Sequence, residues 1–408
     1  MILKIFNKII RLMQIFFLKF INYFLLVIDR FIIKKNNYWI FPVYFVGKGH
    51  FSDNMLAIYE NVKNDPSIKK IVLTKDVDIE LTGENIEILP MTSLKAVYYM
   101  MKSNILFVQH SIWLDFSQAV FQINYPLERK IINLWHGIPL KDISHQNTGI
   151  YNKRATREML NYNIIVSSNT DLNNMKKAFN ITPENQFWIT GLPRNDFLLM
   201  SEIELPIHFQ DELKYIQSIL KNRDLILYAP TYREINVGGE NYNFSKNELK
   251  QLELFLIEHN IVFGIRYHPY LKPKDYQNLL NLKNVIDLSS DIISDVRMLL
   301  RTSSVIVTDY SSLFIDALYI NKKCISFAYD FEHYKKTQRG FFYDFEIIFP
   351  GEICKNFNDL IFCLHQYKES FSDTELKKIE QSKKMFFKQI DLSNSKRVVS
   401  KVKALINK

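Results

Sequence analysis

Short runs of apolar, β-branched and aromatic residues alternate with longer polar, helix-like stretches from Tyr38 onward. Continuous apolar runs are typical of strands buried on both faces, and the stretches between them supply the helical crossovers that parallel strands need. The pattern therefore predicts an α/β protein with parallel sheets. The expected strands are 38–46, 70–74, 104–109, 131–135, 163–167 and 186–190, then 224–229, 261–267, 284–288, 304–308 and 323–328.

The expected strands fall into two series, which indicates two doubly wound, Rossmann-like domains that face a cleft. A chain of 408 residues is long enough for two or three domains, at about 150 residues each. The stretch Glu202–Asp211 has no clear strand or long helix of its own. We therefore predict a first domain over 36–205 and a second over 206–408 that includes the C-terminal helices.

Residues 1–35 form a separate segment with seven Lys or Arg residues and one acid. Polar residues recur there every three to four positions between Ile, Leu, Phe, Met and Val, as on one stripe of a helix. The longest stretch without a charge, between Lys19 and Asp29, is too short to span a membrane, and no signal-peptidase site is evident. The segment predicts an amphipathic helix lying on an anionic membrane surface, although a helix packed on the protein body would share the pattern.

Charge and composition narrow the classes of partner and site. The formal net charge of +9 favours anionic partners. The aromatic residues follow strand and helix periods without interleaving with Lys and Arg, so nucleic acid is not an expected partner. Three cysteines without zinc or disulfide spacing suit a reduced, cytoplasmic setting, and neither a Walker loop nor G-x-G-x-x-G is present.

Two polar motifs follow strands of the first series, where open α/β sheets bind ligands. His136 comes directly after the strand 131–135, and Gly137 would let backbone approach a ligand. A histidine there is a candidate general base, although one bonded within a turn would give the same sequence. After the strand 186–190, Arg194 could reach an anion and Asp196 could cap a helix.

The second series carries hydroxyl, cationic and histidine side chains at its strand ends, a combination suited to phosphate oxygens. Ser311 and Ser312 open an expected helix whose free N–H groups favour an anion, although simple capping by Asp309 or Ser311 is an alternative. The loop 238–240 could cover the site. The candidates in this series are Thr231, Arg233, Arg266, His268, Thr308, Asp309, Ser311, Ser312, Asp316, Asp330 and Arg339.

Taken in order, these motifs resemble those of the CDP-glycerol glycerophosphotransferase family, which includes teichoic-acid primases and polymerases and relatives that build capsules. The match spans roughly residues 38–390, and Gly49–Asn54 resembles the family's early S-D-N segment. Ile138 stands where the family frequently has Thr. The matching motifs are W-H-G-x-P-L-K from Trp135, G-x-P-R-N-D from Gly191, A-P-T-[YW]-R from Ala229, R-x-H-P from Arg266, T-D-Y-S-S from Thr308 with Asp316, and R-G from Arg339.

The resemblance implies a two-domain GT-B fold at the cytoplasmic face of the membrane, with no cofactor and no metal. The second domain would hold a CDP-linked donor, and the first would present the acceptor. His136 and His268 match the family's two functional histidines. The residues that match donor-side positions are Thr231, Arg233, Arg266, Asp309, Ser311 and Ser312.

We therefore expect a transferase that moves glycerol- or ribitol-phosphate from a CDP-linked donor to a hydroxyl of a membrane-linked or capsular polymer and releases CMP. His136 is the expected general base. One alternative is a GT-B glycosyltransferase that moves a sugar from a nucleotide donor. Another is a non-catalytic module that binds anionic lipid or polymer. The polyol, the choice between primase and polymerase, the polymer and the oligomeric state stay open.

Overall fold

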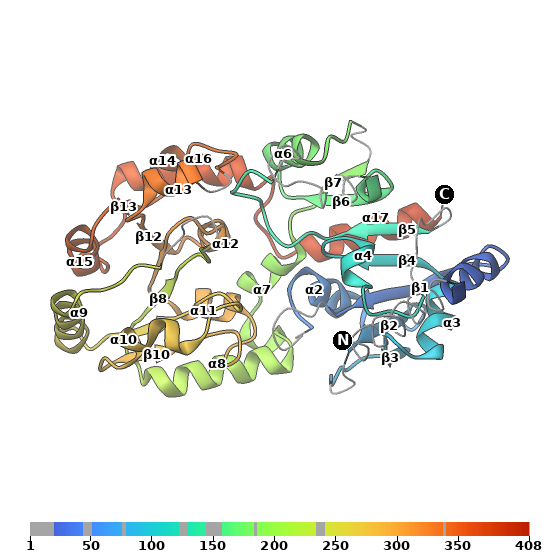
Figure 1. Cartoon of the computed structure of the whole chain (residues 1–408), viewed down its shortest axis with the longest axis horizontal. Coiled ribbons are helices and arrows are strands. Elements are labelled where there is room, and N and C mark those ends of the chain that lie inside the picture. The colour runs from blue at the N-terminus through green and yellow to red at the C-terminus, as the bar shows by residue number, and fades with distance from the viewer. Residues whose placement is uncertain are drawn as a thin grey trace, which may run out of the picture.

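The computed structural model describes residues 20–43, 51–75, 79–121, 129–143, 157–182, 186–233, 241–337 and 340–407. These residues form two α/β halves side by side, each built on a parallel sheet (Figure 1). Every strand expected from the sequence is present, which confirms the α/β class with parallel sheets.

The first sheet has the strand order β3-β2-β1-β4-β5-β6-β7, with every neighbouring pair parallel. Its strands are β1 (Lys35–Pro42), β2 (Lys69–Thr74), β3 (Ile86–Pro90), β4 (Ser103–Val108), β5 (Lys130–Asn133), β6 (Tyr162–Val166) and β7 (Phe187–Ile189). The helices that accompany it are α2 (Asp53–Val62), α3 (Leu94–Lys102), α4 (Ile112–Asp115) and α6 (Asn169–Phe179).

The second sheet has the order β10-β9-β8-β11-β12-β13 and is also parallel throughout. Its strands are β8 (Leu225–Ala229), β9 (Val262–Ile265), β10 (Val285–Asp287), β11 (Val305–Thr308), β12 (Lys323–Phe327) and β13 (Glu352–Cys354). Its main helices are α8 (Ile207–Leu220), α9 (Lys246–Glu258), α11 (Val296–Thr302), α12 (Leu313–Tyr319), α13 (Phe331–Thr337), α15 (Phe357–His365) and α16 (Asp373–Phe386).

In both sheets the strand order reverses beside the first strand, between β1 and β4 and between β8 and β11. Such reversal points leave a crevice at the carboxyl ends of the strands, where ligands bind in open α/β sheets. The strand order therefore predicts that ligands bind near the segments that follow β4 and β5 in one half and β8 and β11 in the other.

The sequence prediction missed β3 and β13, which are edge strands of the two sheets. β3 is partly exposed and carries Glu87 and Pro90, and β13 has only three residues, of which Cys354 is fully buried. Edge strands are often short and mixed in polarity, so they lack the continuous apolar run that marks a central strand.

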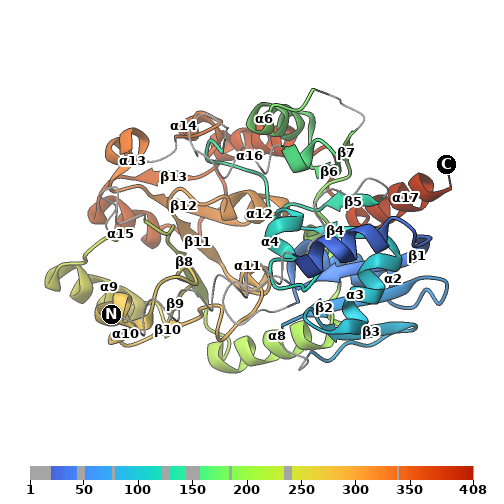
Figure 2. The same ribbon diagram turned by 45° about the vertical axis from the view of Figure 1, so that its right-hand side comes forward.

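The C-terminal helix α17 (Asn394–Ile406) crosses back to the first half (Figures 1 and 2). It packs against α2 and against the short helix η2 (Pro193–Asn195). The predicted division counts this helix with the second domain; it packs on α2 and η2 and also reaches Tyr319 of α12 through Asn394. Asp196 holds its start, because the carboxylate accepts hydrogen bonds from the backbone N–H groups of Asn394 (3.0 Å) and Ser395 (2.8 Å).

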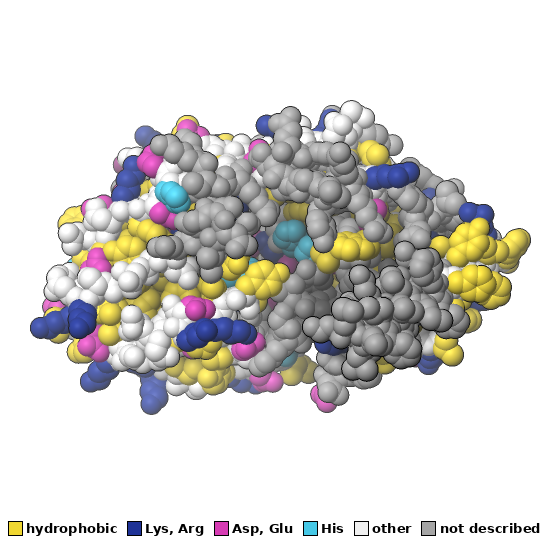
Figure 3. Space-filling view, in the orientation of Figure 1, with side chains coloured by type: hydrophobic (Ala, Val, Ile, Leu, Met, Phe, Trp, Pro, Cys, Tyr) yellow, Lys and Arg dark blue, Asp and Glu magenta, His cyan; other side chains and the backbone are white. Residues whose placement is uncertain are grey.

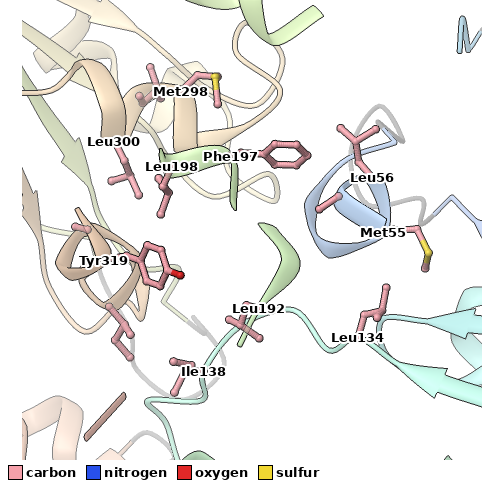
Figure 4. Packing of buried hydrophobic residues seen from close by; sticks show 14 of the residues in the cluster. Met55, Leu56, Leu134, Ile138, Leu192, Phe197, Leu198, Met298, Leu300 and Tyr319 are labelled. Carbon is pink, nitrogen blue, oxygen red and sulfur yellow. The ribbon is translucent and has the colours of Figure 1, made fainter. Parts of the chain in front are cut away.

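Apolar side chains pass without interruption from one half to the other, through η2 and α7 (Asp196–Leu199). Phe197 and Leu198 lie between Leu56 of α2 and the side chains of Met298 and Leu300 on α11 (Figure 4). This shared core fixes how the two halves face each other.

The described part of the N-terminal segment is helical from residue 20 to residue 29. Leu25 and Leu26 on its inner face pack on the core of the first half, and Arg129 donates to the Asp29 carboxylate at 2.8 Å. The outer face leaves Tyr23 70% and Phe24 59% exposed. Figure 3 shows hydrophobic side chains gathered at the end of the molecule where Figure 1 draws this helix. None of the helices within the described ranges is long and apolar enough to cross a bilayer. Residues 1–19 lie outside the described residues.

The attachment of α17 predicts a stability loss in Asn394→Ala. Asn394 is fully buried, and its amide donates to Asp196 (2.8 Å) and Tyr319 (2.9 Å). Removing the amide leaves buried acceptors without a donor, so we expect the free energy of unfolding to fall by about 1–3 kcal/mol in urea titration. The exposed Asn281→Ala should change it by less than about 0.5 kcal/mol. Equal stability of the two variants would contradict this account.

Candidate active site

A cavity of about 620 Å³ opens between the two halves, large enough for a nucleotide-sized ligand. Its first-half wall is the segment 135–143 after β5, and its second-half wall follows β8, β9 and β11. The space-filling view shows histidine side chains in the hollow between the halves (Figure 3). The reversal point of the second sheet, between β8 and β11, thus opens onto this cavity opposite the segment that follows β5.

The turn that carries His136 has a strained backbone. Trp135 has φ +48° and Gly137 has φ +146°, values that residues other than glycine rarely adopt. Such strain persists only where the surroundings hold it in place. Here the fully buried amide of Asn54 donates to the carbonyls of Leu134 (2.9 Å) and Trp135 (3.0 Å). The S-D-N segment at the start of α2 therefore shapes the histidine turn.

Arg194 links this turn to the second half of the molecule. Its guanidinium donates to the His136 carbonyl at 2.8 Å and to the Asp316 carboxylate of α12 at 2.8 Å. Asp53 lies 3.4 Å from the same guanidinium and 3.7 Å from that of Arg297. Although burial acts in the opposite direction, these two arginines hold the pKa of Asp53 below its usual value. The site thus rests on a buried network of alternating charges.

The His136 ring is held by the segment that follows β4. The Gln109 backbone is next to the ring, and its hydrogen bond acts against the larger effects that lower the pKa of His136. His110 stacks on the ring, with centroids 4.8 Å apart, and its Nδ1 lies 3.0 Å from the Asp115 carboxylate. Burial and then His110 lower the pKa of His136 to about 3. His136 is exposed to the cavity, which weakens the effect of burial, and the lowered pKa leaves the ring neutral at pH 7.

His268 lines the opposite wall, directly after β9. Its Nδ1 accepts a hydrogen bond from the Tyr270 backbone N–H at 3.3 Å, which leaves Nε2 as the protonated nitrogen of a neutral ring. Tyr232 packs against the ring at 5.3 Å between centroids. Burial, followed by the charge of Lys141, lowers the pKa of His268. This histidine can therefore donate a hydrogen bond into the cavity without carrying a charge.

Hydroxyl groups complete the second-half wall. Thr231, Ser311 and Ser312 all line the cavity. The Ser311 hydroxyl accepts from the Leu313 backbone N–H at 3.2 Å, so the simple capping alternative describes part of its role. Thr231 donates its hydroxyl to the Asp309 carboxylate, whereas the α12 N-cap Ser312 makes no capping bond through its side chain.

Arg233 is not placed to bind a ligand anion in this structure. It is 3% exposed, and its guanidinium forms ion pairs with Asp309 (2.8 Å) and Asp330 (3.1 Å). The rings of Tyr310 and Tyr334 also lie within about 5 Å of it. These contacts hold the segments after β8, β11 and β12 together. Arg233, Asp309 and Asp330 therefore stabilise the second-half wall of the cavity without facing the ligand.

Several other residues selected from the sequence make hydrogen bonds or ion pairs within the protein. The Thr308 hydroxyl donates to the Ala229 carbonyl at 2.7 Å and is fully buried, which ties β11 to β8. Asp316 pairs with Arg194, and Asp196 caps α17. Arg266 lines the cavity, but its guanidinium donates to the backbone carbonyls of Leu288, Ile293 and Ser294. Arg339 and the loop 238–240 lie outside the described residues.

The structure also brings residues to the site that the sequence argument did not select. Lys141 lines the cavity, and it stands in the same motif as His136. His110 follows β4, so the rule that ligands meet the carboxyl ends of strands could have identified it. Asn54 ends the S-D-N segment noted in the sequence, but its role depends on which carbonyl groups face it.

A family model and the sequence relatives point to one family, and a solved structure shows a similar fold. Residues 25–404 match the family described as CDP-glycerol:poly(glycerophosphate) glycerophosphotransferase. The teichoic acid ribitol-phosphate polymerase TarK of Staphylococcus aureus is 29% identical over 311 residues, which cover 74% of this chain but only 56% of TarK. A teichoic acid poly(glycerol phosphate) polymerase of Bacillus spizizenii is 27% identical over 80% of this chain and 83% of its own length. The solved wall teichoic acid polymerase TagF has a similar fold, with a TM-score of 0.72, 22% identity and coverage of 92% of this chain and 90% of TagF.

The strained turn predicts a large effect of Gly137→Ala. The added Cβ would lie 3.0 Å from the Arg194 guanidinium at a φ that alanine disfavours, so His136 has to shift. A displacement of about 1 Å lowers turnover by about 10²-fold. At Gly340, φ is also positive (+69°) but a Cβ would meet nothing within 4 Å. Gly340→Ala should therefore lose far less turnover, and equal losses would contradict the role given to the Arg194 contact.

Proposed function

The chain belongs to the CDP-glycerol:poly(glycerophosphate) glycerophosphotransferase family, and from this premise we propose that it transfers a polyol-phosphate from a CDP-linked donor to a polymer hydroxyl. The acceptor is a membrane-linked or capsular polymer, and CMP is the second product. The observation that carries the proposal is a neutral His136 facing the phosphate-suited wall of one shared cavity. The polymerase activities named for TarK and for the Bacillus spizizenii relative support the same class of reaction.

In this proposal the two halves have the GT-B arrangement, with the donor in the second half and the acceptor in the first. Two features support this assignment. The reversal point between β8 and β11 opens onto the cavity at Thr231 and Ser311. His136 stands on the opposite wall, where an acceptor hydroxyl can lie between it and the donor phosphate.

The reaction is an in-line displacement at the β-phosphorus of the donor. The acceptor oxygen forms the new P–O bond, and His136 takes the proton of that hydroxyl. The bond between the β-phosphorus and the bridging oxygen breaks, and CMP leaves with the electron pair. The neutral form of His136 is the form that can accept the proton.

The second-half wall stabilises the charge on the phosphoryl oxygens. His268 Nε2–H is the first donor, and the hydroxyl groups of Ser311 and Ser312 are the next. Preorganised donors of this kind act on charge as it develops, in a site partly closed to water. We propose that the reaction proceeds without a metal ion, as the sequence resemblance implies.

The exposed face of the N-terminal helix fits an anionic membrane surface. Phe20, Tyr23 and Phe24 form an outward apolar strip, and the segment before them carries excess Lys and Arg. Helices with one apolar and one basic face lie in the membrane interface. This position would bring a lipid-linked acceptor to the cleft.

The reaction predicts a specific product. Purified protein, CDP-glycerol or CDP-ribitol and a lipid-like acceptor should yield CMP and extended acceptor in equal amounts, with EDTA present. His136→Ala should lower turnover by about 10²–10⁴-fold. The exposed His208→Ala serves as the matched control and should keep wild-type turnover. Release of a nucleoside diphosphate would indicate sugar transfer, and near-normal turnover in His136→Ala would remove this histidine from the mechanism.

The helix predicts membrane binding that depends on its outer face. Phe20→Asp/Phe24→Asp should reduce cosedimentation with vesicles of phosphatidylglycerol and phosphatidylcholine by tenfold or more, since burial of one Phe contributes about 1.5–3 kcal/mol. Phe362 is 62% exposed on α15, so Phe362→Asp is a matched control that should bind like wild type. Equal binding of both variants would place the membrane contact elsewhere.

A further inference from the structure

A CDP-linked donor brings two negatively charged phosphates, and the guanidinium groups expected to meet them are engaged elsewhere. Arg233 is paired with two carboxylates, and Arg266 with three backbone carbonyls. Among the described residues that line the cavity, the lysine and arginine side chains are those of Lys141 and Arg266. Lys141 thus places a flexible cation in the lining of the cavity.

The backbone around Lys141 is fixed to the second half, although its segment leaves the first. Lys141 forms an antiparallel bridge with Phe341. On either side of it, the Phe342 N–H donates to the Leu140 carbonyl at 3.0 Å, and the Asp142 N–H donates to the Gly340 carbonyl at 3.1 Å. The segment that begins at the His136 turn is thus anchored on both walls of the cleft.

The Lys141 side chain is directed toward the donor wall. Its Nζ lies 5.4 Å from the centroid of the Tyr334 ring, which also lines the cavity. Its charge reaches His268, because it is the neighbour that adds to the effect of burial in lowering the pKa of that histidine. Lysine binds phosphate well as a flexible point charge.

We propose that Lys141 binds the diphosphate group of the donor, so that one short segment supplies both the base and the phosphate-binding cation. This inference rests on the proposed function and names a residue within it. The bridge to Phe341 holds the cation beside the second-half wall, and the turn at Gly137 holds His136 opposite. The spacing between base and phosphate is then set within residues 136–141.

The test compares ligands with different numbers of phosphates. The wild-type chain, Lys141→Ala, Lys141→Arg and Lys102→Ala are titrated by calorimetry with CDP-glycerol, CDP and cytidine. Lys102 is the matched control, because its Nζ also lies over a tyrosine ring, 5.6 Å from Tyr98, but on α3 away from the cavity. Loss of one charge-assisted contact should weaken CDP-glycerol and CDP binding on the order of tenfold to a hundredfold in Lys141→Ala. Lys141→Arg should retain most of the affinity, and cytidine binding should not change.

A second readout does not depend on the donor. Removing a nearby cation makes protonation of His268 easier, so its pKa should rise in Lys141→Ala and stay unchanged in Lys102→Ala, as followed by NMR titration of the imidazole.

The outcomes separate this inference from the proposed function. Wild-type binding of CDP-glycerol with equal binding by Lys141→Ala would overturn the role of Lys141 and leave the function in place. An equal loss of cytidine affinity would also overturn it, because the effect would not arise at the phosphates. Absence of CDP-glycerol binding in the wild type would remove the proposed function together with the inference.

Discussion

The buried guanidinium of Arg194 is the interaction on which the site depends. Taking a charge out of water costs several kcal/mol unless good partners surround it. Arg194 has three, namely the His136 carbonyl, the Asp316 carboxylate and, at a longer distance, Asp53. Two of these partners belong to the first half and one to the second. Loss of any partner leaves a buried charge uncompensated, so the position of the base and the contact between the halves are energetically coupled.

This coupling also explains where the backbone is strained. Asp53 and Trp135 both have positive φ, in two segments that face each other across Asn54. Asn54 and Arg194 hold the carbonyls of the turn, and Gly137 leaves the room that the guanidinium needs. The strain in the turn that presents the histidine is therefore held by specific contacts, where a fixed geometry serves catalysis. The strands of both sheets pair in parallel, with one shift of register between β1 and β4.

The sequence allowed much of the fold to be predicted, but only part of the site. Continuous apolar runs identified the central strands because those strands are buried on both faces, whereas β3 and β13 lie at sheet edges and carry no such run. His136, His268 and Ser311 were selected because ligands bind at the carboxyl ends of parallel strands, and all three line one cavity. The same rule selected Arg233 and Thr308, which turn away from the cavity toward Asp309 and Ala229. Position along a strand follows from the sequence, but the partner that a side chain finds depends on segments distant in the chain.

The two histidines show how one type of side chain supplies two complementary functions. Burial lowers the pKa of both, so both rings are neutral near pH 7. His268 accepts a hydrogen bond from the Tyr270 N–H at Nδ1 and keeps an N–H at Nε2, whereas a neutral His136 has a lone pair on one of its ring nitrogens. A lone pair on the acceptor side and a donor on the phosphate side are what a hydroxyl attack on phosphorus requires. The wall on which each ring lies, more than the identity of the residue, therefore assigns its role.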